Sequence, residues 1–370
     1  MTTITVSASN RYQVKIGAGL LSSVGKELKS LNDEKCCRVC IVSDDNVFPL
    51  YGKTVINALE SVGFSVISHV IPHGEGSKCL SVYGEILEHL ASEHISRSDW
   101  LIALGGGVVG DLCGFCAATY LRGIRYLQIP TTLLAMVDSS VGGKTAIDLA
   151  AGKNLCGAFY PPYGVLCDID ALQTLNEDIF ADGMAEVIKY GVIFDRELLE
   201  LLMRDKTAFD RETVIARCID HKRRVVEEDE FDRGVRQLLN FGHTAAHGIE
   251  QHSGYTISHG HAVAAGMGIV TRAAEAAGLI SEPFSPMLET ILADFGLPCD
   301  TDFTAEDMTD AILSDKKRDG GIIRLVIADA PGHAMLWPCP ATECEAFLAR
   351  GIREKNQAQM RSIRYEYNIT

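Results

Sequence analysis

Five short apolar runs, separated by segments with helical spacing, constrain the fold of the first half of this chain. The runs are RVCIVSD at 38–44, FSVISHVIP at 64–72, WLIALGGG at 100–107, IRYLQIP at 124–130 and GVLCDID at 164–170. Between them, apolar residues recur with helical spacing at 55–62 and 82–93. Strands that alternate with helices predict a doubly wound, mainly parallel sheet. Ahead of them, residues 4–6 and 12–16 alternate as expected for a short edge hairpin.

The pattern changes to mostly helical spacing after residue 175. The predicted helices lie at 178–193, 197–203, 212–230, 239–252, 262–277 and 286–295. A predicted strand pair follows at 322–329 and 333–337, and a last helix at 342–350. We therefore predict an α/β nucleotide-binding domain at 1–175 and a mostly α-helical domain at 176–370. A cleft between two domains is the default place for a ligand.

Charge and composition exclude several classes of partner. The formal net charge of -15 argues against a general binder of nucleic acid or anionic membrane. The N-terminus lacks the pattern of a signal peptide, and no apolar run is long enough to span a bilayer. We expect a cytoplasmic enzyme.

Two pairs among the twelve cysteines have zinc-ribbon or redox spacing. Cys37 and Cys40 lie in a predicted strand, and Cys113 and Cys116 lie on a predicted helix. Cysteine packs well as a small apolar residue. We interpret both pairs as reduced, buried and structural in a reducing compartment.

A glycine motif, Gly105-Gly-Gly-Val-Val-Gly110, follows a predicted strand and opens a helix. Its G-x-G-x-x-G spacing lets backbone N–H groups approach a pyrophosphate at a helix N-terminus. The motif departs from the standard fingerprint, because it lies on about the third long strand and no acidic residue follows some twenty positions later. Asp44, at the end of the first run, is an alternative ribose contact. Dinucleotide binding is favoured over a bare tight turn.

A cluster of histidines occupies residues 240–261, which read NFGHTAAHGIEQHSGYTISHGH. Two of them, His243 and His247, are four residues apart and project from one face of a helix. A further histidine after the turn at Gly254, with Glu186 upstream, would complete a divalent-metal site with open positions for a substrate. The alternative is a set of histidines that only form hydrogen bonds.

Basic residues near glycines predict an anion pocket. The segment DSSVGGKT at 138–145 is not a phosphate loop, because Asp138 stands where that motif needs its first glycine. The glycine pair before Lys144 still permits close backbone approach to an anion. The further basic residues of this set are Lys153, Lys189, Lys222, Arg236, Lys316 and Lys317. The residues alone thus predict a nicotinamide cofactor, a metal, and a phosphorylated or carboxylated substrate.

At these residues the chain resembles the 3-dehydroquinate synthase family. The matching strings are GGGVVGDLCGF, YLRGIRYLQIPTTLLAMVDSSVGGKT, GKNLCGAFYPP, GMAEVIKYG and LNFGHTAAHGIE, with fainter matches at HGEGSK (73–78) and DKK (315–317). The resemblance covers nearly the whole chain except its tail. It implies conversion of 3-deoxy-D-arabino-heptulosonate 7-phosphate to 3-dehydroquinate and phosphate, in the shikimate pathway towards chorismate and the aromatic amino acids. It also implies a homodimer.

The implied reaction uses NAD catalytically together with a divalent metal, zinc or cobalt. NAD oxidises the C5 hydroxyl, phosphate leaves by elimination, and NADH returns the hydride before ring opening and aldol closure. The substrate's own phosphate serves as a base, and His247 is the expected proton shuttle.

The resemblance assigns roles to individual residues. It implies Glu186, His243 and His259 as the metal ligands. The implied NAD contacts are Asp44, Glu75, Lys78, Gly107, Val108, Val109, Gly110, Asp111, Thr131, Thr132 and Thr174, with Lys144 and Lys153 also beside the cofactor. The implied substrate pocket is Arg122, Asp138, Lys144, Lys153, Asn154, Lys189, Lys222, Arg236, Asn240 and His247, together with Lys316 or Lys317.

Two positions depart from the family pattern. His261 stands where the family usually has a glutamate after His259-Gly, so it is either a neighbour of the ligands or an alternative ligand. Residues 146–149 read AIDL where the family reads closer to GVNH, and Asp148 adds a negative charge near the expected anion pocket.

Three other readings remain open at this point. They are a different sugar phosphate cyclase, a metal-dependent polyol dehydrogenase of the same architecture, and a non-catalytic metal-binding protein. The basic residues favour a phosphorylated substrate over a simple polyol.

Overall fold

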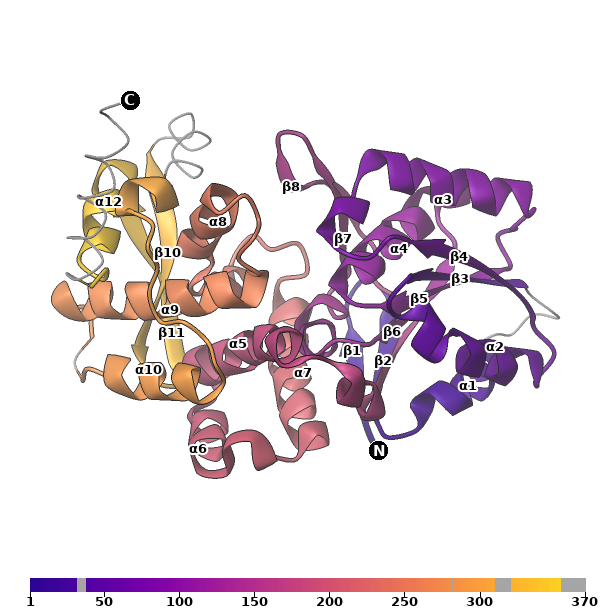
Figure 1. Cartoon of the computed structure of the whole chain (residues 1–370), viewed down its shortest axis with the longest axis horizontal. Coiled ribbons are helices and arrows are strands. Elements are labelled where there is room, and N and C mark those ends of the chain that lie inside the picture. Colours follow the sequence, from indigo (N-terminus) through magenta and orange to yellow (C-terminus); the bar gives the residue numbers. More distant parts are fainter. Residues whose placement is uncertain (32–37, 281, 310–320, 354–370) are drawn as a thin grey trace. The chain divides into compact units, whose positions relative to one another are not determined.

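The computed structural model describes residues 1–31, 38–280, 282–309 and 321–353. These residues form two compact units (Figure 1). The first unit contains Met1–Asn176 and Asp210–Asp232, and the second contains Glu177–Phe209 and the described residues from Arg233 onward. The predicted boundary after residue 175 lies beside the first of these breaks. The sequence did not predict that residues 210–232 would group with the first unit.

A seven-stranded sheet forms the centre of the first unit, with the order β1-β2-β9-β6-β5-β3-β4. Its strands are β1 (Thr2–Ser7), β2 (Arg11–Gly17), β3 (Arg38–Asp44), β4 (Ser65–Ile71), β5 (Trp100–Gly105), β6 (Arg125–Pro130) and β9 (Gly164–Asp168). Only β1 and β2 pair in antiparallel fashion among these described strands, and the other pairs are parallel. The predicted mainly parallel, doubly wound sheet and its edge hairpin are therefore confirmed.

Helices cover both faces of this sheet. They are α1 (Val24–Leu31), α2 (Lys53–Glu60), α3 (Leu80–Ser92), α4 (Gly107–Thr119) and α7 (Arg211–Glu228). Successive side chains of a strand point to opposite faces. Leu101 and Ala103 of β5 accordingly join the apolar cluster that contains α4, whereas Ile102 and Leu104 join the cluster that contains α1 and α2. Burial on both faces explains why the strands read as continuous apolar runs.

Helix α7 belongs to the first unit because its side chains bind β1 and the turn at Ala135–Ser139. Glu212 accepts a hydrogen bond from the Thr2 hydroxyl at 2.7 Å, and Glu227 accepts one from the Ser7 backbone N–H at 2.8 Å. Lys222 forms an ion pair with Asp138. These contacts join residues about 80 to 220 positions apart, which helical periodicity does not encode.

A separate hairpin, which the sequence did not predict, follows the sheet strand β6. It pairs β7 (Lys144–Leu149) with β8 (Gly152–Phe159) in antiparallel fashion. A Cβ atom on Gly157 would lie 2.1 Å from the Thr145 carbonyl oxygen, so this register requires a glycine. The hairpin places Lys144, Lys153 and Asn154 on one small element.

The second unit is mostly helical, as predicted. Its elements include α5 (Glu177–Phe194), α6 (Arg196–Asp205), α8 (His243–His252), α9 (His259–Ala276), α10 (Ser285–Asp294), α12 (Ala341–Ala349) and the antiparallel pair β10 (Ile322–Ala330) and β11 (His333–Pro340). Two predicted helix starts were wrong. Residues 235–240 form a 3-10 turn, so α8 begins at His243 and not at residue 239. Helix α9 begins at His259 and not at residue 262.

Three cysteines of the two predicted pairs lie in the described part of the chain, and all three are free thiols. Cys40, Cys113 and Cys116 lie in one apolar cluster, where burial raises the pKa of each thiol, that of Cys40 to about 12. Cys37 lies outside the described residues. No helix in the described part of the chain is long and apolar enough to cross a membrane.

Candidate metal centre

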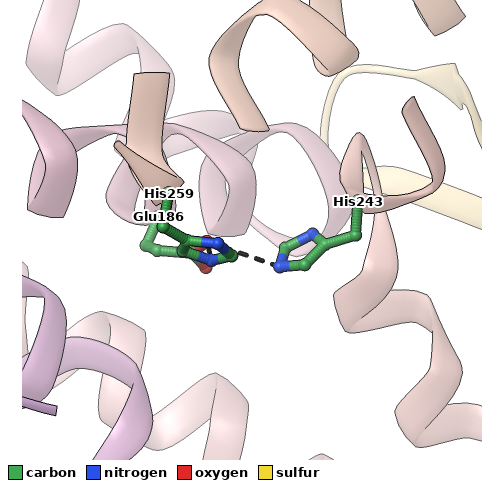
Figure 2. Close-up of side chains that lie close together, drawn as sticks. All are labelled: Glu186, His243 and His259. Atoms are coloured by element: carbon green, nitrogen blue, oxygen red, sulfur yellow. Dashed lines mark ion pairs between the residues drawn. The ribbon is translucent and has the colours of Figure 1, made fainter. Parts of the chain in front are cut away.

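Three side chains from three helices converge in the second unit (Figure 2). Glu186 comes from α5, and His243 and His259 are the first residues of α8 and α9. One ligand atom from each residue lies within 4.8 Å of the other two. The Nε2 atoms of His243 and His259 lie 3.7 and 3.6 Å from the same Glu186 oxygen, Oε1. The structure thus brings together the ligand set that the resemblance implied.

Glycines allow the start of α8 to pack directly against α9. Gly242 has a φ of 78° and turns the chain from the 3-10 segment into α8. A Cβ atom on Gly266 of α9 would lie 2.1 Å from the Gly242 carbonyl oxygen, so the two backbones touch there. His243 is held beside α9 by this contact. Its Nδ1 lies 3.1 Å from the Phe241 carbonyl oxygen, which orients the ring so that Nε2 faces Glu186.

The electrostatics of the site favour a cation between the three side chains. Glu186 is fully buried and forms an ion pair with Lys189, one helical turn on. Burial, aided by the Lys189 charge, lowers the pKa of His243 to about 3, so its imidazole is neutral. Burial opposes protonation of His259 as well, but the Glu186 and Glu250 carboxylates outweigh it and raise the pKa of His259 to about 10.

The donor set fits a divalent cation. A buried carboxylate is costly unless positive charge faces it. Two imidazoles and one carboxylate are ligands that zinc and cobalt accept, and three protein ligands leave positions open for a substrate. The fit rests on side chains that share one small volume around Glu186 Oε1.

Sequence reasoning missed a second carboxylate beside the site. Glu250 is 3% exposed, and its Oε1 lies 3.6 Å from Nδ1 of His259, on the ring edge opposite Glu186. Carboxylates in this position commonly orient a metal-binding histidine. The signal was present, because Glu250 lies seven residues after His243 and therefore on the same face of α8.

The other site residues predicted in the second unit differ in where the structure places them. The His247 ring centroid lies 6.0 Å from that of His243, on the shared helix face. Arg236 is 2% exposed, and Asn240 ends the 3-10 turn before α8. His261 does not join the group, because its Nδ1 contacts Asp182. Lys316 and Lys317 lie outside the described residues.

The nucleotide candidates of the first unit gather at the carboxyl ends of its parallel strands. Asp44 ends β3, the glycine motif follows β5, and Thr131 and Thr132 follow β6. Strands β6, β5 and β3 are neighbours in the sheet, so these ends share one edge, which is where open α/β sheets bind ligands. Helix α4 begins at Gly107, inside the motif. Thr174 lies elsewhere in the chain, where its hydroxyl is 2.6 Å from that of Tyr51.

The predicted nucleotide and substrate residues of the first unit meet at Lys78. Its Nζ donates to Asp111 at 2.6 Å and to Asn154 at 2.5 Å. Lys153 Nζ lies 3.9 Å from the Glu75 carboxylate. Burial raises the pKa of Glu75, and the neighbouring Asp148 carboxylate raises it further. The charges of Lys78 and Lys153 act in the opposite direction.

Asp148, which departs from the family pattern, has a structural contact. Its Oδ1 accepts a hydrogen bond at 2.8 Å from the backbone N–H of Asn154, which has a left-handed φ of 57°. The carboxylate therefore holds the Asn154 backbone in place within the hairpin.

The other predicted pocket residues differ in their contacts. Lys222 pairs with Asp138, and Lys144 pairs with Asp232. Arg122 is exposed and ends a short 3-10 turn with a φ of 66°. Lys144 and Lys222 are therefore already paired with carboxylates. An anionic ligand would have to compete with Asp232 and Asp138 for these lysines.

Comparisons with known proteins match the chain over most of its length. The family model described as "3-dehydroquinate synthase N-terminal" matches residues 68–182, and "3-dehydroquinate synthase C-terminal" matches residues 183–318. The chain is 42% identical over 343 residues to the 3-dehydroquinate synthase of Clostridium kluyveri, which covers 91% of this chain and 95% of that one. It is 43% identical over 348 residues to that of Enterococcus faecalis, covering 92% and 97%.

Solved structures share the fold over most of the chain. A 2-deoxy-scyllo-inosose synthase complexed with carbaglucose-6-phosphate, NAD+ and Co2+ is 25% identical, with a TM-score of 0.84, covering 95% of this chain and 100% of that one. A 2-epi-5-epi-valiolone synthase from Streptomyces hygroscopicus with NAD+ and Zn2+ is also 25% identical, with a TM-score of 0.84 over 94% and 98%. An NADH-dependent butanol dehydrogenase from Thermotoga maritima, at 14% identity and a TM-score of 0.59 over 95% and 98%, is similar in fold alone.

Proposed function

Because this chain belongs to the 3-dehydroquinate synthase family, we propose that it converts 3-deoxy-D-arabino-heptulosonate 7-phosphate to 3-dehydroquinate and phosphate. It is an enzyme, a carbon–oxygen lyase that acts on a phosphate ester. The observation that carries the proposal is the convergence of Glu186, His243 and His259 in a chain that both family models match in succession.

The cofactors are NAD and a divalent metal, zinc or cobalt. Two sugar phosphate cyclases of the same fold contain NAD+ with Co2+ or Zn2+. When bound, NAD accepts and returns a hydride, and the metal supplies an electrophile that stabilises alkoxide character on the substrate. Glu186, His243 and His259 hold the metal, and the Phe241 carbonyl keeps the His243 ring in the binding orientation.

The nucleotide contacts follow from the sheet edge of the first unit. The N-terminus of α4 presents backbone N–H groups to a pyrophosphate, and the glycines of the motif keep side chains out of its way. One oxygen of Asp44 already accepts from the backbone N–H groups of Asn46 and Val47, at 3.0 and 2.8 Å. Those bonds hold the carboxylate in a fixed position, where its other oxygen can accept from a ribose hydroxyl.

Cationic side chains neutralise the phosphate and carboxylate of the substrate. Lys144, Lys153 and Lys222 are the candidates in the first unit, each now facing an acidic side chain. The contact between Lys153 and Glu75, at 3.9 Å, is longer than a direct hydrogen bond. In the second unit, His247 lies on the same helix face as His243 and is the candidate for moving a proton.

We also propose that the enzyme is a cytoplasmic homodimer acting on a small sugar-acid phosphate. The support is the family itself. Light scattering after size exclusion tests the dimer: a mass near twice 40.2 kDa is expected, and a mass near 40.2 kDa contradicts it.

One assay tests the reaction and separates it from its alternatives. The heptulosonate phosphate is supplied with catalytic NAD and zinc, and both released phosphate and net NADH are measured. We expect phosphate release without accumulation of NADH. Stoichiometric NADH would favour a polyol dehydrogenase, and phosphate release from glucose 6-phosphate instead would favour another sugar phosphate cyclase. The matched variants are His243→Ala and His252→Ala, both on α8 but only the first in the group around Glu186.

A further inference from the structure

His261, the residue that departs from the family pattern, joins the two helices that carry Glu186 and His259. It lies in the first turn of α9, two residues after His259. Its Nδ1 is 2.8 Å from Oδ1 of Asp182 on α5. Asp182 precedes Glu186 by four residues, so both side chains lie on one face of α5.

The Asp182 carboxylate caps α9 from a neighbouring helix. Its Oδ1 accepts from the Ser258 hydroxyl at 2.6 Å and from the backbone N–H of His261 at 3.1 Å, in addition to the imidazole. These donors all belong to the start of α9, where the helix dipole favours a negative charge. One acidic side chain of α5 therefore contacts three groups at the start of α9.

The backbones of the two helices touch at the same point. A Cβ atom on Gly260 would lie 2.3 Å from Cα of Asp182. Gly260 stands between His259 and His261, so this close contact of α5 and α9 is one residue from the candidate ligand. A small change in this contact would move the His259 ring relative to Glu186.

We propose that Asp182 and His261 are a positioning pair that sets the distance between Glu186 and His259 for the metal. The inference rests on the proposed function of Glu186 and His259 as metal ligands. Ligand sets bind well only when their supporting residues hold them to about 0.5 Å. The pair is complementary, because an imidazole N–H faces a carboxylate. A glutamate at position 261 would instead place two carboxylates against each other.

The test is a charge exchange measured by metal binding. In metal-free protein, His261→Glu is expected to weaken the affinity for Zn²⁺ and Co²⁺ by about 10- to 100-fold, the usual effect of losing a residue that orients a ligand. The visible absorption of Co²⁺ should change as well, because the ligand geometry changes. The double variant Asp182→Asn with His261→Glu restores a donor opposite an acceptor. Its affinity should return to within about threefold of the wild type.

A matched control has the same chemistry on the same unit. His333 Nδ1 lies 2.5 Å from Oδ1 of Asp329 in an exposed pair on β10 and β11. His333→Glu creates the same pair of facing carboxylates away from the ligands and should leave metal affinity unchanged. Circular dichroism and NAD affinity confirm that each variant is folded.

Two results would overturn the positioning role. One is wild-type metal affinity in His261→Glu, and the other is a double variant as weak as the single one. If His261→Glu does not fold, His261→Gln and His261→Ala replace it: affinity kept by Gln and lost by Ala supports the pair, whereas affinity kept by Ala refutes it. A wild-type protein that binds no metal and releases no phosphate would instead refute the proposed function.

Discussion

His243 and His259 contact the same carboxylate yet differ in charge before a metal binds. Burial leaves His243 neutral, with a pKa of about 3, whereas Glu186 and Glu250 raise the pKa of His259 to about 10. The difference arises from position, because His259 lies between two acidic side chains and His243 lies next to Lys189. A metal ion that binds here displaces the proton of His259 and takes over its positive charge beside Glu186 and Glu250.

Removal of His243 tests the ligand assignment at the residue scale. His243→Ala should weaken metal binding by more than about 100-fold, because a direct ligand contributes more than a residue that only orients one. Turnover should be abolished while circular dichroism is retained. The change on the same helix, His252→Ala, should leave metal affinity as it is. Full activity in His243→Ala would refute its role as a ligand.

The cysteines differ in reactivity according to their surroundings. Burial raises the pKa of Cys40 to about 12 and also raises those of Cys113 and Cys116, so these thiols stay protonated at pH 8. A hydrogen bond from Ser81 lowers the pKa of Cys79, which is partly exposed. The thiolate is the reactive form.

Alkylation of the native protein should therefore modify Cys79 before the buried thiols. The rate should rise with pH until Cys79 is fully ionised, because more thiolate is then present. Peptide mass spectrometry after brief treatment with iodoacetamide gives the site. Early labelling of Cys113 in folded protein would contradict the burial described for α4.

Contacts between elements decide the geometry that single residues need. Helices α5 and α9 approach so closely at Gly260 that no side chain fits between them. This contact holds the start of α9 near α5, and the one between Gly242 and Gly266 holds the start of α8 against α9. The candidate metal centre thus depends on three glycines, Gly242, Gly260 and Gly266, none of which is a candidate ligand.

Gly260→Ala tests the approach of α5 and α9. The added methyl group must push the helices apart, which should lower the free energy of unfolding by about 1–3 kcal/mol and weaken metal binding. Denaturant unfolding and metal titration measure the two effects. Gly84 lies on α3 with open space around it, so Gly84→Ala should stabilise by about 0.5–1 kcal/mol. Equal stability of Gly260→Ala and wild type would mean that the helices can separate without cost.

At the scale of the whole molecule, the two proposed cofactor sites draw on different units. The group around Glu186 belongs to the second unit, whereas the glycine motif and Asp44 belong to the first. A ligand stabilises the native state by about 2.7 kcal/mol at 100 times its dissociation constant.

Metal and NAD should therefore each raise the temperature of thermal unfolding, and a chelator should reverse only the effect of the metal. In His243→Ala the shift with zinc should disappear while the shift with NAD remains. Differential scanning calorimetry measures both. Loss of the NAD shift in this variant would show that the change has damaged the first unit as well.

Local periodicity by itself determined most of the elements. The apolar runs predicted the strands of the parallel sheet, and helical spacing predicted α5 to α10 closely, because each signal lies within a few consecutive residues. The glycine motif likewise predicted a helix start, which the structure has at Gly107. The starts of α8 and α9 were wrong because backbone turns precede both helices, with Gly242 at a φ of 78° before α8, and apolar spacing does not record such turns.

Tertiary structure alone decided which distant residues meet. Helix α7 joins the first unit through contacts with β1 and Asp138, and no pattern within the helix predicts them. Glu186 and His259 are 73 positions apart, and only the packing of α5 on α9 brings them to 3.6 Å. The family resemblance named the ligands, but the contact of Asp182 with His261 was visible only in the fold. Sequence periodicity records which face of an element is buried, whereas the partner of that face is chosen by packing across the chain.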